Sequence, residues 1–233
     1  VVEGLHESAE IRDGSGAIVS RKFYRDGDLI REETYRMNLL FERFIYSNGA
    51  ITEKWLYNYL QSQITSLLLR NDEAYALKIY NLDMLLLQET ITDENGKRHT
   101  TGYTYNKDKT LNSSITAYSE GIGEVKRYQN GTLVSVIRTE NLKQHGETVT
   151  YYPNGQIEKI SQYYEGKQHG PAKTYRKDGS LESEGNFVDG MMDGKFTIYY
   201  ADGNIMVSII YEDDQMRYYE IYRKNGQLWH ELN

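Results

Sequence analysis

A glycine recurs along this chain every 24 residues or so, and the residues around it recur with it. Gly155, Gly179 and Gly203 are 24 residues apart, and Gly226 follows after another 23. Each has a tyrosine four residues before it and a leucine or isoleucine two residues after it. A fixed period of roughly 20 to 50 residues is typical of repeat proteins, in which each unit packs on its neighbours rather than around one central core.

Each repeat contains the residues of two short strands and two turns. An Asn or Asp precedes most of the recurring glycines, as in the pairs Asp26-Gly27, Asn48-Gly49, Asn130-Gly131, Asn154-Gly155, Asp178-Gly179, Asp202-Gly203 and Asn225-Gly226. Such pairs favour the type I′ turn that joins two antiparallel strands. The flanks are rich in Tyr, Thr, Ile and Val and often alternate with polar residues, which predicts half-buried strands. A second turn follows about eleven residues later, as at Glu165-Gly166 and Asp189-Gly190. The pattern therefore predicts an all-β fold, an elongated single-layer antiparallel meander of β-hairpin repeats.

The spacing of the repeats divides the chain into stretches of different regularity. We expect one array over 1–233, with an N-terminal cap over 1–20, regular repeats over 21–57 and 121–233, and degenerate repeats over 58–120. Nine anchor positions, at 27, 49, 84, 109, 131, 155, 179, 203 and 226, predict about eighteen strands. Met84 and Lys109 replace glycine at two of them.

Residues 58–75 interrupt the period. Gly49 and Met84 are 35 residues apart, so this stretch is an insertion or half a repeat. Its apolar residues fit both a helix and a strand, because the segment is too short for periodicity to decide. The neighbouring strands favour a strand.

The pattern Gly-x-x-x-x-Tyr-Tyr-x-x-Gly-x-(Leu/Ile) resembles the MORN repeat. Gly146–Gly155 and Gly170–Gly179 carry it best, together with the linking segments 163–170 and 187–194. The resemblance is good over 120–233, fair over 20–57 and poor between. It is closest to the bacterial variant form, whose members are often labelled antitoxins. The resemblance implies a sheet of hairpins, no enzymatic activity, and neutralisation of a partner protein by binding.

Composition narrows the range of partners. The net charge of −7 argues against nucleic acid, which would require clustered Lys and Arg, and argues weakly against an anionic membrane. It is compatible with a basic protein partner, although charge also keeps an exposed sheet soluble. The chain has no Cys and no apolar run long enough to span a membrane. No sequence motif indicates a cofactor or a catalytic centre.

Candidate binding residues are aromatic or acidic. The tyrosines Tyr128, Tyr152 and Tyr200 recur in register and predict a face of stacked rings, with a partly open, partner-gripping face as the alternative. Acidic residues recur at expected turns, namely Asp189, Asp193, Glu212, Asp213 and Asp214. Asp is favoured at turns for local reasons, and an acidic rim for a partner or a weak cation site is the alternative. His145 and His169 are 24 residues apart and are expected to be turn residues, the alternative being a metal row with Asp193. The predicted partner-binding residues are Trp55, Tyr152, Tyr200, Asp189, Asp193, Glu212, Asp213 and Asp214.

The leading functional hypothesis is a bacterial antitoxin or immunity-type protein that binds a toxin or effector and blocks it sterically. The alternative is an envelope-associated scaffold that contacts membrane lipid or a sister copy, with homo-oligomers formed through exposed edge strands. The chain begins Val1-Val2-Glu3 without Met. Removal of a signal or lipid-anchor segment would explain this and favours the periplasm or envelope over the cytoplasm, but simple trimming would explain it too.

Overall fold

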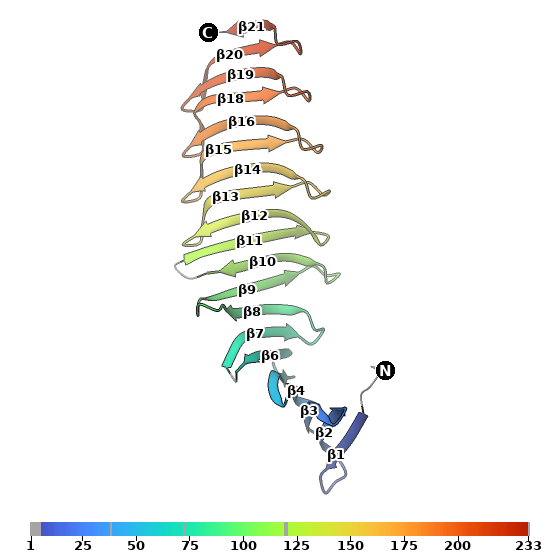
Figure 1. The fold of residues 1–233 in the computed structure, drawn as a ribbon. Coiled ribbons are helices and arrows are strands. Elements are labelled where there is room, and N and C mark those ends of the chain that lie inside the picture. Colours follow the sequence, from blue (N-terminus) through green and yellow to red (C-terminus); the bar gives the residue numbers. More distant parts are fainter. Residues whose placement is uncertain (1–5, 38, 72, 119–120, 233) are drawn as a thin grey trace. The chain divides into compact units, whose positions relative to one another are not determined.

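A computed structural model describes residues 6–37, 39–71, 73–118 and 121–232. These residues form 21 β-strands in an open antiparallel meander (Figure 1). The prediction of an all-β meander of hairpin repeats is confirmed. By their internal contacts the residues fall into two compact units, Val1–Tyr103 and Thr104–Asn233. The single array over 1–233 stays a prediction.

The first unit begins with a hairpin of β1 and β2, and residues 1–5 before it lie outside the described part. The N-terminal cap over 1–20 stays a prediction. Each strand pairs antiparallel with the next in sequence. The strands are β1 (His6–Arg12), β2 (Ile18–Arg25), β3 (Asp28–Arg36), β4 (Leu39–Ser47), β5 (Ala50–Asn58), β6 (Gln63–Arg70), β7 (Glu73–Asn81), β8 (Leu86–Thr92) and β9 (Arg98–Tyr105).

Strand β6 explains the irregular spacing near residue 60. Three strands, rather than two, lie between Gly49 and Met84, so the interruption is half a repeat and is a strand, as expected. An odd number of strands reverses the edge on which the anchor turns lie. Gly27 and Gly49 are therefore on one edge of this unit and Met84 is on the other.

The best-buried side chains of the first unit share one face of its sheet. Cross-strand register places Glu33, Ser66 and Thr101 in one row and Phe23 and Ala76 in the next row of the same face. Ser66 is fully buried and Glu33 is 5% exposed. Glu33 is held by Arg43 at 2.9 Å and by the Tyr35 hydroxyl at 2.5 Å. Burial of a carboxylate in so thin a sheet requires partners of this kind.

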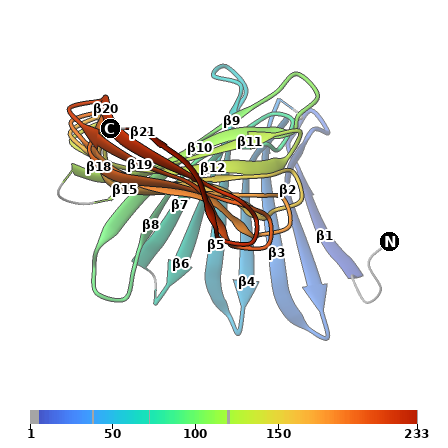
Figure 2. The ribbon, with the colours of Figure 1, turned by 90° about the horizontal axis from the view of Figure 1, so that it is seen from above.

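The second unit contains the regular repeats. Its hairpins lie one above the next in Figure 1, and in Figure 2 strands β15, β18 and β19 follow similar courses. The strands are β10 (Leu111–Ala117), β11 (Ile122–Gln129), β12 (Thr132–Glu140), β13 (Lys143–Tyr151), β14 (Ile157–Tyr164), β15 (Lys167–Tyr175), β16 (Leu181–Val188), β17 (Met191–Met192), β18 (Gly194–Tyr199), β19 (Ile205–Glu212), β20 (Gln215–Tyr222) and β21 (Leu228–Leu232).

The described strands number 21 rather than the eighteen expected. The three additional strands are β1 of the N-terminal hairpin, β6 of the half repeat, and β17. Strand β17 is separated from β18 by Asp193, and both pair with β16. The repeat count was therefore correct, and the difference comes from local irregularities.

The type I′ prediction is confirmed at some anchors and wrong at others. At Asn130-Gly131 both residues have positive φ, +50° and +77°, as they do at 26–27 and 48–49. At 154–155, 178–179, 202–203 and 225–226 only the glycine does. There the Gly155 amide donates to the Tyr152 carbonyl, which makes a type I turn closed by a left-handed glycine. Pro153, at the second position of this turn, is the local signal for type I.

The sheet of the second unit is a single layer. In the described part of the second unit, small residues fill the buried positions. Thr148, Ser161, Ala172 and Gly185 form one cross-strand row through β13, β14, β15 and β16. Stability must therefore come from contacts between adjacent hairpins.

Candidate functional site: the turn edges of the second unit

The second unit has two rows of turns, one on each side of its sheet. We call the row with turns at 152–156, 176–180, 200–204 and 223–227 the anchor edge. We call the opposite row, with turns at 165–166, 189–190 and 213–214, the acidic edge. The two rows differ in what their side chains do.

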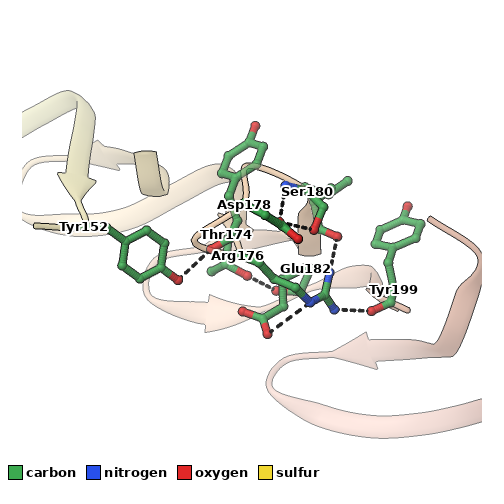
Figure 3. A network of polar contacts seen from close by, with 10 residues as sticks. Tyr152, Thr174, Arg176, Asp178, Ser180, Glu182 and Tyr199 are labelled. Carbon is green, nitrogen blue, oxygen red and sulfur yellow. Dashed lines mark hydrogen bonds and ion pairs between the residues drawn. The ribbon is translucent and has the colours of Figure 1, made fainter. Parts of the chain in front are cut away.

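On the anchor edge, side chains join each hairpin to the next. The Tyr152 hydroxyl donates to the Tyr175 carbonyl at 2.8 Å, and the Tyr200 hydroxyl donates to the Tyr222 carbonyl at 2.8 Å. Arg176 takes the same repeat position and donates to the Tyr199 carbonyl (Figure 3). We call these contacts the anchor braces.

The acceptors of the anchor braces lie where the strand ladder is interrupted. Register shifts occur at Tyr175, Tyr199 and Tyr222. A bulge removes ladder pairing locally, so the carbonyl is available to a side chain. Stacking of the Tyr152 and Tyr200 rings was the wrong expectation. Repeats are two strands, or about 9.6 Å, apart, which exceeds the roughly 4.5 to 7 Å of ring pairs.

On the acidic edge, the backbone makes the equivalent connections. The Gly166 amide donates to the Gln144 carbonyl and the Gly190 amide to the Gln168 carbonyl, both at 2.8 Å, and the Asp214 amide donates to the Met192 carbonyl at 2.9 Å. Each of these bonds joins a turn of the acidic edge to the preceding hairpin.

Five of the predicted site residues lie at or beside two adjacent turns of the acidic edge, three of them in the turns themselves, Glu212 at the end of β19 and Asp193 between β17 and β18. They are Asp189, Asp193, Glu212, Asp213 and Asp214. The Arg217 guanidinium lies 3.0 Å from the Glu212 carboxylate and forms an ion pair with it. One carboxylate oxygen of Asp214 accepts a hydrogen bond from the Met192 amide at 3.1 Å. Glu212 and Asp189 have side chains 66% and 55% exposed. This group is a concentrated negative surface.

Carboxylates on the sheet faces differ from those on the acidic edge. Glu184 on β16 accepts the Tyr199 hydroxyl at 2.6 Å and lies 3.4 Å from the Lys173 ammonium group. The Tyr199 hydrogen bond holds the pKa of the Glu184 carboxyl below its usual value. Glu184 is thus engaged in the fold, whereas the Asp189 and Glu212 side chains of the acidic edge are more exposed.

The two histidines are each the third residue of a strand and do not occupy turns, so that expectation was wrong. His145 on β13 lies 3.3 Å from Glu140, and His169 on β15 lies 3.7 Å from Asp189. The Tyr164 ring lies between the two imidazoles, with centroids 5.0 and 6.2 Å away. The doubled tyrosine 163–164 is the sequence signal for this contact. Within the described ranges, no group of three His, Cys, Asp or Glu could hold a metal ion.

The remaining predicted residue, Trp55, lies in the first unit. It is half-buried on β5, its ring stacks on Tyr80 with centroids 5.4 Å apart, and its cross-strand neighbour is the fully buried Ser66. Trp55 is therefore a packing residue of its own sheet face. Among the described residues, no helix is long and apolar enough to cross a membrane.

Comparison with known families identifies the repeats. Segments 144–164, 168–189 and 192–213 match the family described as MORN repeat variant. Each match covers one hairpin of the second unit, and the family is an interaction module that is generally non-catalytic. The chain has no match among curated proteins.

Two solved structures share low similarity with the chain. The structure titled TcdB2-TccC3-TEV is 13% identical over 93% of this chain and 14% of that chain, with a TM-score of 0.19. This chain thus spans about a seventh of that protein's length. A porin-like protein from Bacteroides uniformis ATCC 8492 is 11% identical over 89% of this chain and 84% of that chain, with a TM-score of 0.24. Both TM-scores are too low to support an inference.

Proposed function

We propose that this chain is a non-catalytic interaction protein whose acidic edge binds a basic surface on a partner protein. The observation that carries the proposal is the group of five carboxylates at or beside two adjacent turns. In the described part of the chain, the basic groups close to them are Arg217, 3.0 Å from Glu212, and His169, 3.7 Å from Asp189. Clustered charge of one sign speeds association with an oppositely charged surface and selects against like-charged partners.

The partner's class follows from the MORN resemblance. The variant form is often labelled antitoxin, so we propose that the partner is a toxin or effector and that binding neutralises it. An open sheet suits steric blocking better than catalysis, because it offers a long surface rather than an enclosed pocket. The acidic edge would cover a basic rim around the partner's active site.

The test is co-purification with the protein encoded by the neighbouring open reading frame, followed by measurement of its affinity and toxicity. In the main variant, Asp189, Asp193, Asp213 and Asp214 become Asn and Glu212 becomes Gln. Asn tolerates the positive φ of +50° and +63° at 213 and 214, so the turns should persist. A control removes three charges at or next to the anchor edge, with Glu158→Gln on β14, Glu182→Gln on β16 and Asp202→Asn in a turn.

The expected result is a complex that weakens with salt and is lost only in the acidic-edge variant, together with protection from toxicity. Equal affinity of both variants for the partner would show that the acidic edge does not contribute to binding. Absence of any stoichiometric protein partner would overturn the proposal.

A second candidate function is an envelope-associated scaffold that binds lipid or assembles end to end. Strand β21 favours it, because all five of its residues are exposed, with Trp229 63% exposed. An edge strand of this kind can pair with another chain. Recovery in a lipid or envelope fraction without a protein partner would support this candidate over the first.

A further inference from the structure

The first unit carries a row of exposed apolar side chains that neither its fold nor the acidic edge explains. It lies on three successive turns of one edge, β3–β4, β5–β6 and β7–β8. We call it the apolar turn row. Its members are Met37, Leu39, Tyr59, Leu60, Leu82 and Met84, which are 95, 51, 41, 100, 47 and 50% exposed.

The turns of the opposite edge in the same unit are polar. They contain Asp26-Gly27, Asn48-Gly49 and Asp93–Lys97. Met37 and Met84 moreover adopt φ of +50° and +63°, a region that favours Gly, Asn or Asp. Methionine at these two positions remains at least half exposed and has an unfavourable backbone conformation. A contiguous exposed apolar patch indicates a binding surface, and here two of its residues are kept despite the strain of a positive φ.

The same surface contains both protruding side chains and a hollow. A hollow of about 570 Å³ lies between the β3–β4 turn and the end of β5. It is lined chiefly by Met37, Leu40, Phe41, Leu56 and Leu60. An isologous interface between two copies requires one patch to be complementary to itself. An exposed Leu60 beside an apolar hollow satisfies that requirement.

Opposite charges stand at the two ends of the row. Arg36 lies at the β3–β4 end, with its guanidinium 3.7 Å from the centre of the Phe41 ring. Asp83 lies at the β7–β8 end, between Leu82 and Met84. Successive turns on one edge are two strands apart, so the row is about 20 Å long with Leu60 near its middle.

We propose that the apolar turn row binds a second copy of this chain, antiparallel, about a two-fold axis near Leu60. This arrangement places Arg36 of each copy against Asp83 of the other and the outer methionines against the opposing row. The contact is small, so the dimer is weak and depends on concentration. It uses the first unit only and is independent of the acidic edge and of β21.

Charge reversal provides the test, by sedimentation velocity of the full chain between about 5 and about 500 µM. Arg36→Asp and Asp83→Arg each place like charges at both ends of the contact, so each alone should weaken the dimer by roughly tenfold or more. An equimolar mixture of the two variants should dimerise again, because both contacts then join opposite charges. Leu60→Asp should abolish dimerisation without affecting folding, since Leu60 is fully exposed.

Two controls separate this contact from others. Lys97→Asp, on the opposite edge, and Trp229→Glu, on β21, should leave the dimer unchanged. A chain that is monomeric throughout, a mixture that fails to recover, or equal weakening by Lys97→Asp would overturn the proposal. So would monomers that bind phosphatidylcholine vesicles through Leu60, a result that would assign the row to a lipid surface.

Discussion

The hydroxyl of Tyr152 donates a hydrogen bond to the carbonyl of Tyr175, 2.8 Å away, and joins two successive hairpins of the second unit. Tyr200 and Tyr222 repeat this relationship at the same distance. In each case the acceptor lies at a register shift. The bulge therefore contributes to the connection between the two hairpins, because it leaves a backbone carbonyl without a ladder partner, and the tyrosine of the preceding repeat donates to that carbonyl.

Replacing Tyr152 with Phe should destabilise the protein by about 0.5 to 1.5 kcal/mol, the net value of one intramolecular hydrogen bond. The ring and its packing are kept, so the loss reports the hydroxyl alone. Urea unfolding measures the change. Tyr151→Phe is the matched control, since the Tyr151 side chain has no polar partner in the described part of the chain. Equal effects at both positions would show that the brace contributes nothing.

Arg176 performs the same task with a longer, charged side chain. It donates to the carbonyl of Leu181 at 2.8 Å as well as to that of Tyr199. Arg176→Ala should therefore cost more than Tyr152→Phe, roughly 1.5 to 3 kcal/mol. Arg176→Tyr restores the residue found in neighbouring repeats and should recover part of the loss in urea unfolding. A tyrosine variant no more stable than the alanine variant would contradict the equivalence of these positions.

Lys109 occupies a turn position at φ +68°, where most other repeats have glycine. Lys109→Gly should stabilise the protein slightly, by about 0.5 kcal/mol. Glycine removes the strain energy of a left-handed lysine in the folded state, and this gain exceeds the entropic cost of a more flexible unfolded chain. Gly155→Ala is the reciprocal change and should destabilise by about 1 kcal/mol. An added Cβ at Gly155 meets nothing within 4 Å, so its cost is purely conformational. Thermal unfolding of both variants checks the opposite signs.

Gly185 is required for a different reason, namely space. A Cβ at this position would collide with the Phe196 ring, which packs edge-on against Tyr211. Gly185→Ala should destabilise by about 1 to 3 kcal/mol, as expected for overpacking. The control Gly102→Ala also lies in a strand, with nothing within 4 Å of its added Cβ. A similar loss for both variants, measured by urea unfolding, would exclude the steric explanation.

Turn carboxylates should make the protein sensitive to acid. Hydrogen bonds from the Thr110 hydroxyl and amide lower the pKa of Asp108 below its usual 3.8, and Ser180 lowers that of Asp178 in the same way. A lowered folded-state pKa stabilises the fold above the unfolded value, and that contribution is lost as pH falls through the folded value. Asp108→Asn keeps the acceptor oxygen and should reduce the loss of stability between about pH 5 and pH 2. Unfolding midpoints across that range test this, and unchanged acid sensitivity would contradict it.

Much of the fold could be predicted from local signals. Glycines with period 24 marked the anchors, and even the degenerate anchors Met84 and Lys109 adopt the expected left-handed conformation. These features were predictable because a positive φ and a two-residue alternation are properties of a few consecutive residues. The grouping of Asp189, Asp193 and Asp213 followed from the same period, which puts equivalent turns on one edge.

The sequence by itself determined the repeat, the strands and the positions of the turns. Tertiary structure alone decided which tyrosines brace neighbouring hairpins and on which edge each anchor lies. The physical reason is that these properties depend on residues about 23 positions apart. A bulge at Tyr175 or an extra strand such as β6 changes which groups meet there, and no local pattern records that change.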